Sequence, residues 1–211
     1  MTTSQKAVSN SQITNFLEWE DIEAATEELY DYYKSYVGQV KNPELIKTYC
    51  HQMIEWSMFG KQGLYIIGDV GCGKTTLLNA FCKDITMHFY SNDSRTRGGF
   101  QWESASTLCD WAVNNPERLE EFKNAEWIAI DDLGQEPDEV KNYGTILKPI
   151  EEILMYRYNR KNTIDKHRMM VTICTTNLTP DAIKSKYGVR VADRMAEIMS
   201  VMYIKEKSYR R

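Results

Sequence analysis

The residues whose types and spacing most clearly indicate a chemical role form a glycine-rich segment that ends in a lysine and two threonines. The segment fits the pattern G-x-x-x-x-G-K-[ST], which is typical of loops that wrap around the phosphates of a nucleotide. Glycines let backbone N–H groups turn inward toward phosphate oxygens, and a helix that begins at the lysine presents the positive end of its dipole to them. The sequence therefore predicts a nucleotide-binding loop made of Gly68, Asp69, Val70, Gly71, Cys72, Gly73, Lys74, Thr75 and Thr76. Lys74 is predicted to reach the β- and γ-phosphates and Thr75 to bind Mg²⁺.

A second group with acid–base potential is the pair Asp131 and Asp132, which directly follows the apolar run Trp127–Ile130. Taken alone, two acids after a strand could equally be a helix cap and a turn. With a phosphate-binding loop earlier in the chain, they fit the carboxyl edge of a parallel sheet, where such folds bind ligands. Asp131 is then predicted to hold Mg²⁺ through water, and Asp132 to orient or deprotonate an attacking water.

Two further groups carry weaker signals. Asn177 follows another apolar run, Val171–Cys174, and could hydrogen-bond a γ-phosphate or the attacking water; it could equally serve a turn before Pro180. Arg190 and Arg194 are four residues apart and would share one face of a helix. They could complete a phosphate site from a neighbouring subunit, or form surface pairs with acidic neighbours.

These groups must be positioned by elements whose apolar spacing alternates between strand and helix. Strands are predicted at residues 64–67, 100–103, 127–130, 169–174 and 201–204. Helices are predicted within residues 13–37 and at residues 43–59, 75–89, 106–114, 117–124, 143–159, 179–186 and 191–197. Such alternation indicates a parallel sheet covered on both faces. We expect a three-layer α/β fold with a five-stranded parallel sheet, preceded by a tail and an acidic helical extension over residues 1–42.

Composition narrows the class of protein. The longest apolar runs are far shorter than a membrane span, and the polar start of the chain lacks a signal core, so we expect a cytoplasmic protein without a membrane partner. The five cysteines are scattered, with no C-x-x-C pair, so neither zinc nor disulfides are predicted. The net charge is −4, yet residues 148–211 carry 14 Lys and Arg against 7 Asp and Glu. This basic third either contacts nucleic acid or is simply a solvated face.

Taken together, the four groups resemble the DnaC/DnaI bacterial helicase loaders and the related IstB transposition ATPases, a clade of the AAA+ superfamily. The family pattern joins a phosphate-binding loop to I-D-D-L-G-x-E, T-T-N-L and G-x-R-x-x-D-R. The same order occurs here at Gly68–Thr75, Ile130–Glu136, Thr175–Leu178 and Gly188–Arg194. The closing Lys207-Ser208-Tyr209-Arg210 is also similar to the S-Y-R that ends the family.

The resemblance implies an AAA+ ATPase domain over residues 43–211, with no evident C-terminal helical lid, that hydrolyses ATP to ADP and phosphate. It implies that Asn177 is sensor 1, that Arg194 is an arginine finger, and that Arg190 is a second arginine near the same subunit interface. It also implies an ATP-dependent homo-oligomer that helps a replicative DNA helicase, or another replication or transposition protein, onto single-stranded DNA, which it would itself bind weakly.

The resemblance leaves other functions open. The loaders carry a larger N-terminal domain than the 42 residues that precede the ATPase region here, so helicase binding is in doubt or falls on the acidic helix. An IstB-like transposition helper and a nucleotide-gated interaction module with little hydrolysis are the alternatives. A small-molecule kinase fits less well, because the Asp-Asp and Thr-Thr-Asn strand ends are not typical of one.

Overall fold

The protein is seen in a computed structural model that describes residues 19–92, 100–160 and 170–205. Three features expected from the sequence lie at least partly outside these residues. They are the tail with the start of the first helix at residues 1–18, the first residue of the strand expected at 169–174, and the closing segment 207–210.

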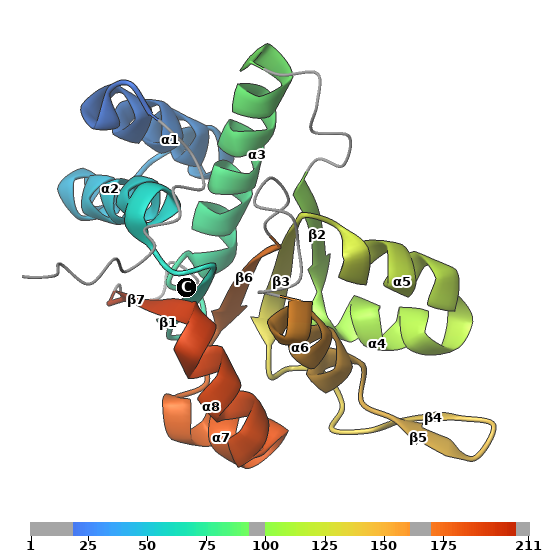
Figure 1. The fold of residues 1–211 in the computed structure, drawn as a ribbon. Helices are drawn as coiled ribbons and strands as arrows, with labels where there is room; N and C mark the ends of the chain where they lie inside the picture. Colours follow the sequence, from blue (N-terminus) through green and yellow to red (C-terminus); the bar gives the residue numbers. More distant parts are fainter. Residues whose placement is uncertain (1–18, 93–99, 161–169, 206–211) are drawn as a thin grey trace, which may run out of the picture.

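A five-stranded parallel sheet forms the middle of the molecule, as predicted (Figure 1). Its strand order is β2-β3-β6-β1-β7, so β6 separates the strand of the glycine-rich loop from the strand of the paired aspartates. The strands are β1 (Gly63–Gly68), β2 (Phe100–Ser104), β3 (Trp127–Leu133), β6 (Val171–Thr176) and β7 (Met199–Ile204).

Helices cover both faces of the sheet, which makes the predicted three layers (Figure 1). One face carries α1 (Ile22–Val37), α2 (Pro43–Phe59) and α3 (Lys74–Asn92). The other carries α4 (Ala105–Asn114), α5 (Pro116–Asn124), α6 (Pro149–Arg160), α7 (Pro180–Tyr187) and α8 (Val189–Ile198). None of the described helices is long and apolar enough to cross a membrane.

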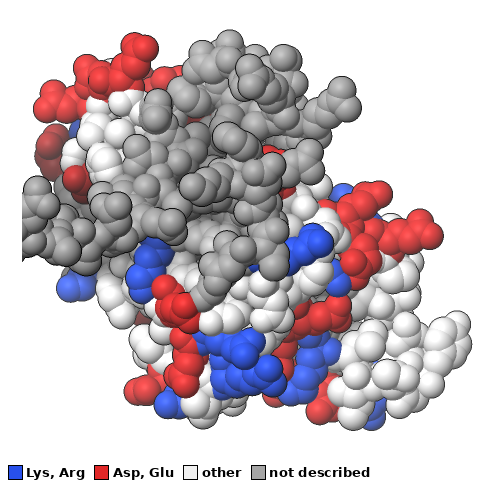
Figure 2. Space-filling view, viewed as in Figure 1, with Lys and Arg blue, Asp and Glu red and all other residues white. Residues whose placement is uncertain are grey.

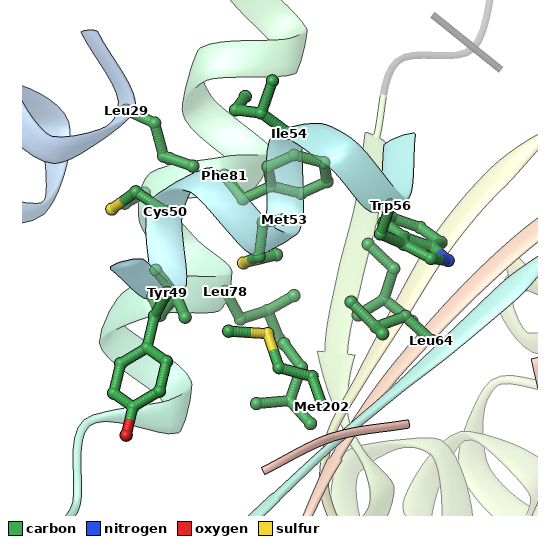
Figure 3. Close-up of a cluster of buried hydrophobic side chains, with 14 of the residues drawn as sticks. Leu29, Tyr49, Cys50, Met53, Ile54, Trp56, Leu64, Leu78, Phe81 and Met202 are labelled. Carbon is green, nitrogen blue, oxygen red and sulfur yellow. The ribbon is translucent and has the colours of Figure 1, made fainter. Parts of the chain in front are cut away.

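The central strands are apolar along their whole length because both of their faces are covered. In β1, Leu64 and Ile66 point into the core beneath α1, α2 and α3, while Tyr65 and Ile67 point into the core beneath the other helices. Figure 3 shows the first of these cores, in which Leu29 of α1 and Phe81 of α3 meet the side chains of α2. The acidic extension therefore packs through α1 onto the same face as the helix of the glycine-rich loop.

One predicted helix was wrong at its start. Residues 143–147 do not begin a helix; they belong to a hairpin of β4 (Val140–Asn142) and β5 (Thr145–Leu147), and α6 begins at Pro149. Tyr143 and Gly144 form the two-residue turn with φ of 46° and 84°. Positive φ at both central residues suits the twist of a tight hairpin, and a proline at the first helical position fixes where α6 starts.

Candidate functional site

A cavity of about 390 Å³ opens at the carboxyl ends of the central strands. Its lining comes from the end of α1, the glycine-rich loop, the start of α3 and the ends of β3 and β6. The residues are Tyr33, Val37, Val70, Gly71, Gly73, Lys74, Thr75, Thr76, Asp132, Gln135 and Asn177. Eight of these were predicted as site residues, so segments far apart in the sequence meet where the fold class places a ligand.

The glycine-rich loop adopts a conformation that only its glycines permit at low cost. Gly71 and Gly73 have φ of 80° and 98°, a region that other residues seldom adopt. Lys74 begins α3 and is buried, and its Nζ donates to the backbone carbonyls of Gly68 and Asp69, 2.9 Å from each. The ammonium is thus held inside the loop, where a phosphate group could replace these carbonyls.

The other loop residues face elsewhere. Gly68 and Asp69 line a neighbouring cavity on the other side of the loop, together with Asn177, Tyr203 and Lys205. Cys72 is buried in the core, and a Cβ added at Gly68 would lie 2.8 Å from its Sγ. The side chain of Cys72 therefore packs beneath the loop, against Gly68, and does not face the cavity. Burial raises the pKa of its thiol.

A β-bulge places the two aspartates. Strand β3 pairs with β6 at Ile130–Cys174 and again at Leu133–Thr176, so Asp131 and Asp132 together oppose the single residue Thr175. The Thr175 hydroxyl accepts the Asp132 N–H at 2.9 Å and donates to Asp131. Asp132 has φ of 53°, which an aspartate tolerates better than most residues. A bulge re-aims side chains, and here Asp131 is buried while Asp132 is exposed at the cavity.

Asp131 and Thr75 form an oxygen-rich corner beneath the cavity. The Thr75 hydroxyl lies 3.0 Å and 3.1 Å from the two carboxylate oxygens of Asp131. Burial raises the pKa of Asp131, and Asp132 raises it further, whereas hydrogen bonds from Thr175 and Thr75 act in the opposite direction. Hydroxyl and carboxylate oxygens are the donors that Mg²⁺ prefers, and a cation here would offset the repulsion between the two aspartates. The residues present therefore fit the predicted metal.

Asn177 and Gln135 meet at the cavity wall. Gln135 Nε2 donates to Asn177 Oδ1 at 3.1 Å, and both side chains line the cavity with Asp132. Asn177 lies directly after β6, as predicted, and is exposed. The wall opposite the phosphate-binding loop is thus made of one carboxylate and two amides.

The two arginines lie on α8 and are not among the residues that line the cavity. Arg190 is exposed. Arg194 donates to Asn159 Oδ1 at 3.2 Å, and its guanidinium lies 4.9 Å from the centre of the Tyr158 ring. The structure therefore holds Arg194 against α6, and its predicted role at a neighbouring subunit's nucleotide stays a prediction.

Three lining residues were not predicted as site residues. Gln135 lies inside the quoted motif Ile130–Glu136, so the motif itself was a signal for it. Tyr33 and Val37 come from the last turns of α1, and no local pattern links them to a loop that begins more than thirty residues later. They give one end of the cavity an apolar and aromatic wall, of the kind that suits a nucleotide base.

The segment that holds most of these residues matches a known protein family. A family model described as RNA helicase matches residues 64–178, which run from β1 through the aspartates to the segment after β6. A search of curated proteins finds no significant match.

Two solved structures match the chain. The crystal structure of the DnaC helicase loader matches with a TM-score of 0.57 and 21% identity, over 82% of this chain and 96% of that chain. AMPPCP-bound DnaA from Aquifex aeolicus matches with a TM-score of 0.42 and 18% identity, over 92% of this chain and 50% of that one. The predicted three-layer α/β fold around a five-stranded parallel sheet is confirmed, and the DnaC helicase loader shares this fold. The chain belongs to the RNA helicase family, whose model matches more than half of it.

Proposed function

We propose that the protein is a Mg²⁺-dependent ATPase. One observation carries the proposal: a single cavity joins the lysine and threonines of a phosphate-binding loop to a carboxylate and two amides at adjacent strand ends. The loop alone would suit any nucleotide-binding protein. The polar wall opposite it supplies what hydrolysis needs in addition, namely groups that can orient and deprotonate water.

The roles of the residues follow from where their atoms lie. Lys74 would exchange its two carbonyl partners for β- and γ-phosphate oxygens, and backbone N–H groups of the loop would hold the remaining oxygens. Thr75 and, through water, Asp131 would hold Mg²⁺, which when bound draws charge from the phosphates. Asp132 would accept a proton from the attacking water, which Asn177 and Gln135 would orient. The base would lie against Tyr33 and Val37.

We further propose that hydrolysis serves the assembly of a DNA replication machine on single-stranded DNA, with a replicative helicase or a related replication or transposition protein as partner. The fold shared with the DnaC helicase loader supports this role. An IstB-like transposition helper and a nucleotide-gated module remain the alternatives. The family match favours a second candidate, in which the nucleic acid is RNA and the chain acts as part of an RNA helicase. Phosphate release measured with single-stranded DNA and with single-stranded RNA of the same sequence distinguishes the two.

Among the described residues of the basic third, the lysines differ in how far they are exposed. Lys186 is mostly buried and bonded to Asp138 at 2.5 Å, so it is engaged, whereas Lys184 and Lys205 are exposed. In the lower part of the face drawn in Figure 2, basic and acidic side chains are interspersed. Aromatic side chains can stack on the bases of a single strand. On strand β2, Phe100 packs on Trp127, whereas Trp102 is 38% exposed. Weak binding that falls with added salt is the expected behaviour of such a surface.

Replacing Lys74 with Ala is expected to weaken ATP binding by about 10- to 100-fold, because hydrogen bonds to a charged group contribute about 1.5–3 kcal/mol each. Titration calorimetry with Mg·ATP measures the change. Lys83 lies on the same helix, at Tyr32 and Tyr36, so Lys83→Ala serves as the matched control and should bind like wild type. Unchanged affinity in Lys74→Ala would contradict the assignment of the site.

A shared active site between subunits is expected if Arg194 acts on a neighbour's nucleotide. Arg194→Ala should then bind ATP normally but hydrolyse it poorly, and mixing it with Lys74→Ala should restore part of the activity. The rescue arises because one mixed interface keeps both an intact cavity and an intact arginine. Phosphate release across a range of protein concentrations checks this, and turnover that is independent of concentration with no rescue would rule it out.

A further inference from the structure

The segment between the catalytic strand β3 and the hairpin contains a buried carboxylate that the proposed mechanism does not use. Glu136 is 5% exposed, and both of its oxygens are hydrogen-bonded. Oε2 accepts the Gly134 N–H at 2.8 Å, and Oε1 accepts the Tyr187 hydroxyl at 2.5 Å. Tyr187, the last residue of α7, is also buried. A carboxylate inside a protein is costly to keep, so two well-formed bonds to it indicate a fixed arrangement.

A lysine closes the same arrangement from α7. Lys186 Nζ donates to the backbone carbonyl of Glu136 at 3.0 Å and to Asp138 at 2.5 Å, and it lies 3.6 Å from Glu136 Oε1. Burial and the Glu136 carboxylate both raise the pKa of Tyr187, so the tyrosine stays a phenol and remains the donor. Lys186 and Tyr187, at the end of α7, thus bond to the acidic residues of segment 134–138.

The same segment bonds to the loop after β6 and packs closely on it. Gln135 Nε2 donates to Asn177 Oδ1, and Gly134 lies so close to Leu178 that a Cβ added there would be 2.4 Å from Leu178 Cδ1. Gly134 has φ of 100°, and the Gln135 N–H donates to the Asp132 carbonyl at 3.0 Å. A turn this tight leaves little freedom, so the bond from the Gly134 N–H to Glu136 helps set where Asp132 and Gln135 point.

We propose that Glu136 and Tyr187 are a positioning pair for the proposed ATP hydrolysis, on which this inference rests. Glu136 fixes the turn that presents Asp132 and Gln135 to the cavity, and Tyr187 fixes Glu136 to α7. Because α7 is joined to α8 through Gly188, the pair also links the cavity wall to the helix that carries Arg190 and Arg194. A shift of α7 and α8 at a subunit contact would thereby reach the catalytic carboxylate.

The test compares two small changes with a matched control. Tyr187→Phe removes only the hydroxyl. Glu136→Gln keeps the shape of the side chain but has one acceptor oxygen instead of two, so it cannot accept both the Gly134 N–H and the Tyr187 hydroxyl in the same way. Tyr156→Phe is the control: it removes a hydroxyl that also bonds between helices, to Asn124, and that is remote from the cavity lining. For each variant the kcat, the dissociation constant of Mg·ATP and the Tm are measured.

We expect kcat to fall about tenfold in Tyr187→Phe and up to about 100-fold in Glu136→Gln, since misplacing a catalytic group by about 1 Å can cost that much. The dissociation constant should change less than about twofold, because Lys74 bonds to the Gly68 and Asp69 carbonyls and Thr75 bonds to Asp131, away from the pair. Tyr156→Phe should keep wild-type kcat. The double variant should resemble Glu136→Gln alone, because both changes break one linkage.

The outcomes separate the two proposals. A wild-type protein without turnover would remove the proposed function itself. A wild-type protein with turnover, together with variants of unchanged kcat, would overturn only the positioning pair. A parallel fall of kcat, ATP affinity and Tm in the variants would also overturn the positioning pair, because general destabilisation of the fold produces that pattern. Measuring well below the Tm of the least stable variant keeps the comparison decisive.

Discussion

Asp132→Asn is expected to lower ATP turnover by about 10²–10⁴-fold, the usual contribution of a general base, while Mg·ATP stays bound. The asparagine keeps the size and polarity of the side chain but cannot take a proton from water. Asp132 is exposed at the cavity and held there by its N–H bond to Thr175, so the change leaves the bulge and the Thr75–Asp131 corner in place. Single-turnover phosphate release and nucleotide affinity, measured on the same preparation, check the two halves of the expectation.

Asp131→Asn tests the division of labour between the two aspartates. It should raise the Mg²⁺ concentration needed for half-maximal activity, because Asp131 is the carboxylate beside Thr75. Asp110→Asn, at an exposed position on α4, is the control and should behave like wild type. If Asp132→Asn hydrolyses ATP at the wild-type rate, the base is another group, and Gln135 and Asn177 would orient water for it.

The predictable part of this molecule is the part that depends on sequence patterns of short range. The apolar runs of β1, β3 and β6 are strands because they are buried on both faces, and the residues after them gather at one sheet edge because the strands are parallel. Those two facts suffice to bring Lys74, Asp132 and Asn177 together. The sequence could also mark Gly71 and Gly73 as necessary, since the loop conformation needs them.

The rest depends on pairing and packing that no short pattern encodes. The bulge that turns Asp132 into the cavity exists because Thr175 on another strand bonds to both aspartates. Tyr33 reaches the cavity only because α1 packs on α3. The predicted helix over residues 143–159 extends into the hairpin because the spacing of Ile146 and Leu147 also suits a helix, and no local pattern marks the turn at Tyr143 and Gly144. The network around Glu136 joins residues some fifty positions apart.

A large loss of folding stability is expected when Arg157 is replaced, a residue that the sequence analysis did not single out. Arg157 of α6 is 2% exposed, and all three of its nitrogens donate. Nε bonds to the Thr172 hydroxyl at 2.7 Å. Nη1 and Nη2 bond to four backbone carbonyls, those of Lys123, Ala125, Glu126 and Val171, at 2.7–3.1 Å. Burial lowers the pKa of Arg157 to about 9, so the guanidinium is still charged at neutral pH.

Arg157→Met should therefore destabilise the fold by several kcal/mol, since each buried carbonyl left without a donor costs about 1–3 kcal/mol. Part of this is offset because the buried charge is removed with it. The offset cannot be complete, because four of the acceptors are backbone carbonyls that stay where they are. The Glu126 carbonyl keeps the Val171 N–H as a donor at 2.8 Å, so the cost falls on the acceptors that lose their donor. Against a total stability of about 5–15 kcal/mol, the remaining loss should leave much of the protein unfolded or lower the Tm by more than about 10 °C.

Arg157→Lys separates the lost charge from the lost geometry. An ammonium keeps the charge but has three donors on one atom, so it cannot serve carbonyls on both sides as the planar guanidinium does. The expected order of stability in urea unfolding is Arg, then Lys, then Met, with exposed Arg160→Met as the control that stays near wild type. A Met variant as stable as the parent would mean that water or backbone shifts satisfy these carbonyls. Otherwise the loss falls on the starts of β3 and β6, whose far ends carry Asp132 and Asn177, so activity should vanish with the fold.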